Sequence, residues 1–148
     1  HAANLEKAKL RGAHLRRAEL SGATLREARA RSAHLEGAVL EGARLERSDF
    51  RDAYLEGSNM SDVLLAGCKL AGAHINTESN FAGTDWWAAD FYYTDPDTGG
   101  TVVDAILLAT LFERYKESVP SDRTALHPSV RAFMEPNDSD AAGTESSA

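Results

Sequence analysis

The sequence predicts a solenoid, a fold in which short repeats wind into stacked coils. A small residue recurs every five residues from Ala3 to Ala73, and a large apolar residue stands two places after nearly every one of them. A period of five fits neither the roughly 3.6-residue turn of an α-helix nor the alternation of a β-strand. Self-similarity at a fixed period is the signature of repeat architectures, in which each repeat contacts only its neighbours.

We number each unit from its small residue, so the large apolar residue takes the third position. The first positions are Ala3, Ala8, Ala13, Ala18, Ala23, Ala28, Ala33, Ala38, Ala43, Ser48, Ala53, Ser58, Val63, Cys68 and Ala73. The third positions are Leu5, Leu10, Leu15, Leu20, Leu25, Ala30, Leu35, Leu40, Leu45, Phe50, Leu55, Met60, Leu65, Leu70 and Ile75. One extra residue follows Thr77, and the frame resumes at Ser79, Thr84 and Ala89, which gives 18 units in all.

This pattern resembles the consensus of the pentapeptide-repeat family, which is Ala, then Asp or Asn, then Leu, then two variable residues. The resemblance covers residues 3–93. It implies an all-β solenoid, a right-handed quadrilateral parallel β-helix in which each unit forms one side and four units form one coil. The first and third residues would point inward, and only a small residue would fit near each corner. Residues 1–93 would then form about four and a half coils.

Residues 20 apart stack in such a fold, and one stacked pair supports the four-sided arrangement. Ala30 is the one third position without a large side chain, and Phe50 is among the few with an oversized one. A small residue beneath a large one keeps the packed volume nearly constant, as close packing requires.

The repeats are followed by a segment that predicts a helical C-terminal cap over residues 94–134. The run TDPDTGG at 94–100 is rich in Pro, Gly and Asp, which indicates a turn. A helix is predicted over residues 101–118, with Thr101 as its N-cap and Asp104 three residues later in the style of a capping box. Because this helix is apolar on nearly all sides, we expect it to close the last coil over Trp86 and Phe91.

A second, short helix is predicted over residues 126–134, with Pro128 in its first turn. We expect it to fold back near the outward rings of Trp87, Tyr92 and Tyr93, because clustered aromatic rings are usually covered. The polar run 135–148 predicts disorder. The apolar first helix also predicts a homodimer interface, formed by Ile106, Leu107, Leu111, Phe112 and Tyr115.

The composition limits the classes of function. The 148 residues carry 16 Lys/Arg and 23 Asp/Glu, a formal net charge of −7, which disfavours direct nucleic-acid binding. Cys68 is the single cysteine, so the chain forms no internal disulfide, and its first position predicts a buried small residue. No apolar run spans a membrane and no secretory signal is present, which favours a cytoplasmic location. The chain begins at His1 rather than Met, which is compatible with a longer parent chain carrying an anchor or another domain.

In the predicted coil, the outward charged residues differ from one side to another. One side gathers a candidate strip for an anion or an anionic partner, consisting of Lys9, Arg11, Arg29, Arg31, Arg51 and Lys69, against the acids Asp49, Asp52 and Asp90. The opposite side gathers Glu19, Glu41 and Asp62 with no base. A solvated face is the simpler interpretation of the strip, because Arg and Glu are common at the outward positions of such repeats.

A third side stacks His14, His34, Tyr54 and His74 at second positions. Rungs about 5 Å apart could bring two imidazoles near one metal ion, or could make a pH-sensitive column. Tyr54 interrupts the column, however, no carboxylate or thiolate completes a ligand set, and parallel rings aim their nitrogens poorly for chelation. We therefore favour packing as its role and expect no metal and no cofactor.

The sequence shows no Ser-His-Asp, Cys-His, phosphate-loop or paired-carboxylate arrangement, and a smooth rod offers no concave pocket, so no enzyme activity is expected. The favoured hypothesis is a protein-interaction scaffold with a protein partner of unknown identity. The alternative, suggested by the family resemblance, is a DNA mimic that binds and protects the type II topoisomerase gyrase. The repeats carry 12 Lys/Arg against 13 Asp/Glu, whereas a DNA mimic needs dense negative charge.

Overall fold

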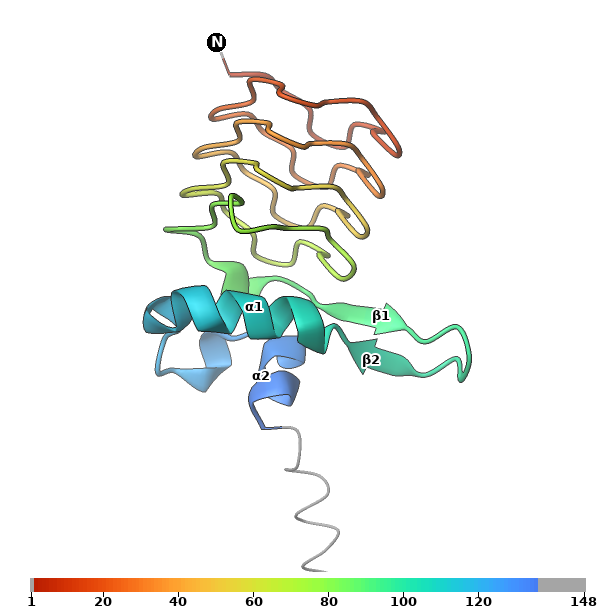
Figure 1. The fold of residues 1–148 in the computed structure, drawn as a ribbon, viewed down its shortest axis with the longest axis vertical. Helices are drawn as coiled ribbons and strands as arrows, with labels where there is room; N and C mark the ends of the chain where they lie inside the picture. The colour runs from red at the N-terminus through yellow and green to blue at the C-terminus, as the bar shows by residue number, and fades with distance from the viewer. Residues whose placement is uncertain (1, 136–148) are drawn as a thin grey trace, which may run out of the picture.

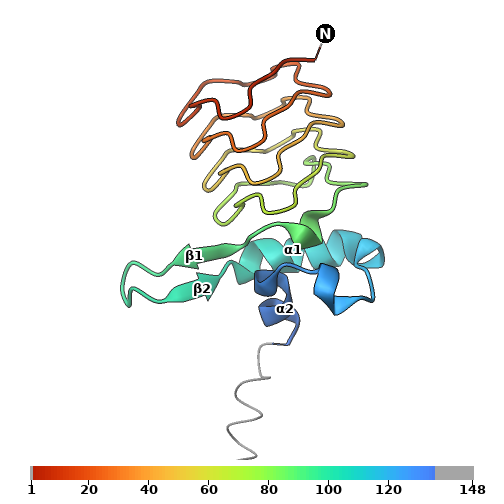
Figure 2. The same ribbon diagram turned by 180° about the vertical axis from the view of Figure 1, so that it is seen from behind.

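The computed structural model describes residues 2–135. As far as Phe91 the chain winds into stacked four-sided coils, and the helices gather beyond the last coil (Figures 1 and 2). Parallel bridges join residues 20 apart, such as Lys9 with Arg29 and His34 with Tyr54. Four five-residue units therefore complete one coil, as the resemblance to a quadrilateral β-helix implies.

Backbone hydrogen bonds join each coil to the next. The amide of Thr24 donates to the carbonyl of Ala3 in the coil before it, at 2.9 Å. The amide of Leu25 donates to the carbonyl of Arg44 in the coil after it, at 2.7 Å. Because neighbouring residues bond in opposite directions along the rod, the buried backbone groups of the interior coils are satisfied without long strands.

The corners are formed by the fifth residue of the unit, which adopts a left-handed conformation in every unit from Ala3 to Gly72 and again at Gly83. The φ angle is +59° at Lys7 and +77° at Gly72. The amide of Ala8 donates to the carbonyl of Leu5 at 3.0 Å and so closes the turn around Lys7. At Gly72 a Cβ atom would lie 2.1 Å from Oδ1 of Asp52, so a larger residue would force a shift there. The first residue of each unit follows the corner directly, and in the interior coils it lies buried inside, as predicted.

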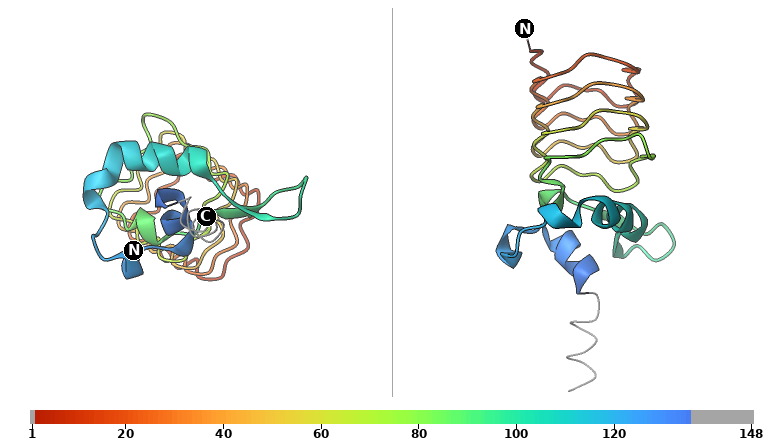
Figure 3. Two further views of the ribbon diagram at one scale, coloured as in Figure 1. Left: turned by 90° about the horizontal axis from the view of Figure 1, so that it is seen from below. Right: turned by 60° about the vertical axis from the view of Figure 1, so that its left-hand side comes forward.

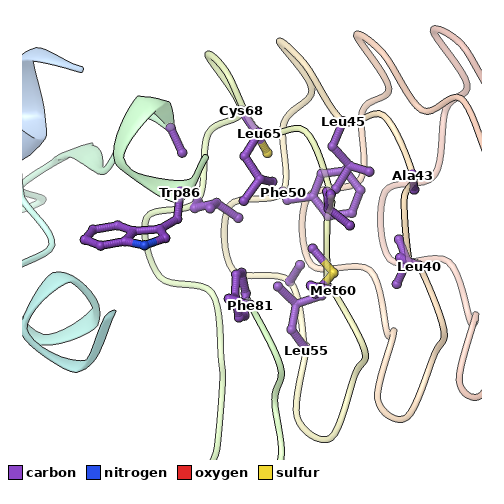
Figure 4. Packing of buried hydrophobic residues seen from close by; sticks show 14 of the residues in the cluster. Leu40, Ala43, Leu45, Phe50, Leu55, Met60, Leu65, Cys68, Phe81 and Trp86 are labelled. Atoms are coloured by element: carbon purple, nitrogen blue, oxygen red, sulfur yellow. The ribbon is translucent and has the colours of Figure 1, made fainter. Parts of the chain in front are cut away.

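First and third residues fill the interior of the rod, as predicted. Figure 4 shows the third-position side chains in the middle of the coils, including Leu45, Phe50 and Met60. All three are fully buried. The first coil has a neighbouring coil on only one side among the described residues, and its third-position side chains remain half-buried; they are Leu5, Leu10 and Leu15.

The extra residue predicted after Thr77 is confirmed by the bridge pattern. Asn59 pairs with Asn80, a spacing of 21 residues instead of 20. The Oδ1 atom of Asn76 accepts hydrogen bonds from the amides of Gly57 at 2.9 Å and Glu78 at 3.1 Å, which fixes the bulge. Arg114, far along the chain, donates to the carbonyl of Asn76 at 2.9 Å and ties the bulge to a helix.

A hairpin replaces the beginning of the first predicted helix. Strand β1 (Tyr92–Thr94) pairs antiparallel with β2 (Thr101–Val103), with Tyr93 opposite Val102. Thr and Val suit a strand, and the Asp- and Gly-rich run before them forms the connecting turn. Helix α1 therefore spans Ala105–Tyr115, and its N-cap is Asp104 rather than the predicted Thr101.

Helix α1 lies across the end of the coils (Figure 3). It buries Leu107, Leu108 and Leu111, which belong to the same core cluster as the coil interior. Phe112 meets the ring of Trp86 edge-on, with a centroid separation of 5.0 Å. The chain then passes through two 3-10 turns, Lys116–Ser118 and Arg123–Ala125. A third 3-10 turn lies earlier in the chain, at Trp86–Ala88.

Helix α2 (Pro128–Met134) packs back on the last coil, as predicted, but it leaves the ring of Tyr93 exposed. The amide of Phe91 donates to Ser129 Oγ at 2.9 Å, and the amide of His127 donates to the Trp87 carbonyl at 2.9 Å. Phe112 and Phe133 stack at 5.4 Å and join the two helices. The segment predicted to be disordered, 135–148, lies outside the described residues except for Glu135. Within residues 2–135, no helix combines the length and the apolar character needed to cross a bilayer.

His127 should make the stability of this helical segment sensitive to pH. Its Nδ1 atom accepts from the amide of Ser129 at 3.1 Å, which requires that this nitrogen carry no proton. Burial lowers the pKa of His127 below its usual 6.5, the Asp90 carboxylate opposes the shift and Arg131 adds to it. The unfolded chain therefore binds the proton more readily, and stability falls as the pH drops below about 6.5.

We expect a smaller free energy of unfolding in urea at pH 5.5 than at pH 7.5 for the wild-type protein. The variant His127→Asn keeps an oxygen that can cap α2 but does not titrate, so its difference between the two pH values should be smaller. Equal differences for the two proteins would contradict the assignment to His127.

Candidate anion-binding face

The ladder of parallel bridges brings the predicted basic residues to one side of the rod. Lys9, Arg29, Asp49 and Lys69 follow one another in successive coils as bridge partners. Arg11, Arg31 and Arg51 stand two residues further along in the first three coils, also at outward positions. All six residues of the predicted strip therefore share one face, which we call the cationic face.

The cationic face is hollowed. A depression of about 570 Å³ is lined by the six predicted residues together with Glu27, Ala28, Arg47 and Asp49. The predicted strip does not include Arg47 and Glu27, because each is the fifth residue of a unit on the adjacent side of the coil. The signal was present in the sequence, since a residue at a corner can reach either of the two sides that meet there. Seven of the chain's 16 Lys and Arg residues thus gather around one hollow with only two acids.

Two of these arginines are paired within the chain. Arg51 binds Asp49 with both ends of its guanidinium, at 2.9 Å from Nε to Oδ1 and 2.6 Å from Nη2 to Oδ2. Partial burial raises the pKa of Asp49, but the hydrogen bonds from Arg51 outweigh it and hold that pKa below its usual value. Arg31 Nε lies 3.4 Å from Asp52 Oδ2, with both side chains nearly half exposed, so this pair is weak.

The other five cations of the hollow form no ion pair with any residue of the described part of the chain; they are Lys9, Arg11, Arg29, Arg47 and Lys69. Guanidinium groups offer paired donors that match carboxylate and phosphate oxygens. These five side chains are therefore available to an anion without the loss of an internal pair.

The opposite side of the rod carries the reverse charge. Glu19, Glu41 and Asp62 all lie there, in successive coils that bridge through Glu19, Val39 and Asn59. The remaining outward positions of these units are small or neutral, and the one base at a corner leading into this side from the preceding unit 13–17 is Arg17. The rod is therefore polarised across its width, and an anion is attracted to one side and repelled from the other.

The predicted histidine column is present as a stack of rings. The centroids of His14 and His34 are 5.2 Å apart, and Tyr54 lies 4.5 Å from both His34 and His74. The rings are within 14° of parallel, so their nitrogens do not converge. Among residues 2–135 no group of three or more His, Cys, Asp or Glu side chains is arranged to hold a metal ion.

A network of ion pairs lies beside the stacked rings. His34 Nδ1 lies 3.2 Å from Glu36 Oε1, and Arg16 lies 3.2 Å from the other oxygen of Glu36. Desolvation raises the pKa of Glu36, but hydrogen bonds from its own backbone amide and from His34, together with the charge of Arg16, lower it overall. These contacts fix the side chains at the edge of the stack and support packing as its role.

The predicted dimer residues divide into two groups. Leu107 and Leu111 are buried against the coils, and Phe112 and Tyr115 are half-buried there, with Tyr115 Oη accepting from the amide of Phe81 at 3.0 Å. Ile106 alone projects into solvent, with 84% of its side chain exposed. The four inner residues therefore hold α1 on the solenoid, and contact with a second copy would form around Ile106.

Cys68 occupies a first position in the interior, as predicted. Its side chain is fully buried, and Ser48 Oγ donates to its Sγ at 3.3 Å. Burial raises the pKa of the Cys68 thiol to about 12. Because the thiolate is the reactive form, this cysteine is a packing residue and not a nucleophile.

The comparison with known families agrees with this architecture. A family model of eight pentapeptide repeats matches residues 1–37 and again residues 25–62. The matched repeats of this chain are pentapeptide repeats. The match implies a right-handed course for the quadrilateral β-helix described above. The repeats continue beyond the matched residues, as the parallel bridges extend to Asp90.

Solved structures of pentapeptide-repeat proteins align with this one. A protein of the Arabidopsis thaliana thylakoid lumen is 24% identical over 75% of each chain, with a TM-score of 0.40. A protein of the cyanobacterium Cyanothece is 29% identical over 52% of this chain and 56% of its own, with a TM-score of 0.39. HetL of Nostoc, involved in the regulation of heterocyst differentiation, is 21% identical over 69% of this chain and 65% of its own, with a TM-score of 0.33. The curated proteins contain no match to this sequence.

Proposed function

We propose that this protein is a non-catalytic interaction scaffold that holds an acidic protein partner on its cationic face. The observation that supports the proposal is the set of five unpaired cations around one hollow of about 570 Å³. The hollow is lined by the outward side chains of a hydrogen-bonded ladder, so the backbone that carries its charges is ordered before a partner arrives. Such preorganisation reduces the entropy that binding must overcome.

An acidic protein suits this surface better than a nucleic acid. The formal net charge of the whole chain is −7, and residues 94–148 carry 10 Asp/Glu against 4 Lys/Arg, so a long polyanion that continued from the cationic face toward the C-terminal segment would be repelled there. The residues that line the hollow include no aromatic ring on which a base could stack. A protein segment of limited length can place carboxylates on the five cations without meeting the acidic regions.

The same charges argue against the DNA-mimic alternative. A mimic that binds gyrase must present the dense negative charge of a phosphate backbone. The cationic face of this solenoid is positive, and the outward acids of the opposite side are only Glu19, Glu41 and Asp62. A scaffold for an acidic partner needs no such negative surface.

In this proposal the helices α1 and α2 act as a C-terminal cap that covers the last coil and blocks edge pairing there. Self-association through α1 is the second part of the proposal. Ile106 is the most exposed of the large apolar side chains among residues 2–135, and it would form the centre of a homodimer contact.

A binding titration tests the acidic-partner proposal. The probe is a fluorescein-labelled decamer of glutamate, and the readout is fluorescence anisotropy at two salt concentrations. We expect the double variant Arg29→Gln with Lys69→Gln to bind the probe about threefold to tenfold more weakly, because each exposed pair contributes modestly. Binding by the wild-type protein should also weaken as salt is raised.

The matched control is Arg44→Gln. Arg44 occupies the same second position in its unit as Arg29 does, but on the neighbouring side, where it pairs with Glu46 at 3.5 Å. Its removal should leave the affinity nearly unchanged. Equal losses for Arg44→Gln and the double variant, or tighter binding of a single-stranded DNA decamer than of the glutamate decamer, would contradict the proposal.

A further inference from the structure

A second hollow adjoins the first at the C-terminal end of the cationic face. Its volume is about 600 Å³, and it shares Arg31 and Arg51 with the first hollow. Its other lining residues come from the last coils and from the β1–β2 hairpin: Asp52, Ala71, Gly72, Tyr93, Thr94, Pro96 and Asp104. A bound segment could therefore pass from the cationic face directly onto the hairpin.

The hairpin lies beyond the last coil, at the level of α1, and projects sideways (Figures 1 and 2). It projects past the outline of the coils when the molecule is seen along the rod (Figure 3). Its connecting turn is closed by the amide of Asp95 donating to the carbonyl of Gly100 at 2.8 Å. Its base is tied to the coil by the amide of Gly72, which donates to Asp104 Oδ2 at 2.8 Å. Both ends of the hairpin are thus held by hydrogen bonds.

The second hollow differs in chemistry from the first. Its two acids are already engaged, Asp104 by the amides of Gly72 and Leu107 and Asp52 by Arg31. What it adds is apolar surface, from Pro96 and from Tyr93, whose side chain is 41% exposed. Tyr93 is one of three exposed large apolar or aromatic side chains in the described part of the chain.

From these observations we infer that the partner segment is extended, carries a run of Asp or Glu, and ends in an aromatic residue that packs on Tyr93. The inference rests on the proposed function, because the acidic run would occupy the cationic face. The four coils from Lys9 to Lys69 span roughly 15 Å, which matches five extended residues at about 3.3 Å each. The next residues of the segment then reach the hairpin, where aromatic pairs are favourable in edge or offset contact.

Three fluorescein-labelled peptides test this inference by anisotropy. The first is a hexapeptide of alternating Glu and Asp, and the other two add Gly-Phe at its C-terminus or Phe-Gly at its N-terminus. We expect one of the two Phe peptides to bind about threefold to tenfold more tightly than the plain hexapeptide. The terminus at which Phe increases the affinity shows in which direction the segment lies along the rod.

Two variants of Tyr93 test whether the increase in affinity that Phe provides depends on the hairpin. Tyr93→Thr keeps a strand-forming residue and should abolish the gain while changing the affinity of the plain hexapeptide by less than about twofold. Tyr93→Phe keeps the ring and should retain the gain. Leu64→Ala removes another exposed apolar side chain, on a different side of the rod, and should have no effect.

The outcomes separate this inference from the proposed function. If neither Phe peptide binds more tightly, or if the gain survives in Tyr93→Thr, the aromatic subsite is overturned. The scaffold proposal then still stands, provided that the plain hexapeptide binds and is weakened by Arg29→Gln with Lys69→Gln. If no acidic peptide binds at all, both proposals are overturned.

Discussion

Replacing Phe50 with alanine is expected to lower the free energy of unfolding by about 3–5 kcal/mol. Phe50 is fully buried at a third position in the middle of the rod. The coils above and below are fixed by backbone hydrogen bonds, such as the Phe50 amide to the Lys69 carbonyl at 2.9 Å, so they cannot collapse into the cavity. Urea denaturation followed by circular dichroism measures the loss.

A double-mutant cycle tests whether Phe50 and Ala30 share one volume. The two residues occupy the same third position in adjacent coils, and both are fully buried. Ala30→Leu should overpack the wild-type interior, and Phe50→Leu should leave a void, each costing about 1–3 kcal/mol. The double variant should lose about 1 kcal/mol less free energy of unfolding than the two single variants lose together, because the added side chain fills part of the void.

The control pair for this cycle is Ala30→Leu with Leu70→Ala. Leu70 belongs to the same column as Ala30 but lies two coils away, so the effects of these two changes should add. Strict additivity in the Ala30 and Phe50 pair as well would show that the small and large residues do not compensate each other.

The coil could be predicted from the sequence because its repeat is enforced by packing at every unit. The extra residue after Thr77 follows from the periodicity, and the inward residues and the stacking of residues 20 apart follow from the resemblance to the pentapeptide-repeat family. The composition of the cationic face follows as well, since position in the repeat determines the side. The histidine column follows for the same reason.

Other features depend on contacts that the periodicity does not encode. The left-handed fifth residue was missed, although Gly is frequent there, because non-Gly residues such as Lys7 and Arg17 also adopt that conformation. The pairing of Arg51 with Asp49 within the strip needed side-chain geometry. The strand Thr101–Val103 was taken for a helix because its partner, Tyr92–Thr94, belongs to the end of the repeats.

Asp104→Ala should lower the free energy of unfolding by about 2–3 kcal/mol. The two oxygens of this carboxylate have separate tasks. Oδ1 accepts from the amide of Leu107 at 3.1 Å and caps α1, and Oδ2 accepts from the amide of Gly72 at 2.8 Å in the last coils. Alanine would remove the cap and would leave the Gly72 amide without its acceptor, at the point where solenoid, hairpin and helix meet.

The variant Asp104→Asn separates these two tasks. Asparagine has one acceptor oxygen, so it can satisfy either the Leu107 amide or the Gly72 amide, but not both. Its loss of stability should therefore fall between those of the wild type and Asp104→Ala. A loss as large as that of alanine would show that the charge, rather than the number of acceptors, decides the effect.

Asp122→Ala is the matched control for Asp104→Ala, because Asp122 is also a capping aspartate. It accepts from the amide of Thr124 at 3.0 Å and caps the 3-10 turn Arg123–Ala125. All of its hydrogen bonds are local and exposed, so its removal should cost clearly less stability than the removal of Asp104. If Asp104→Ala costs no more than Asp122→Ala, the bond to Gly72 contributes nothing, and the helices are held on the solenoid by apolar packing alone.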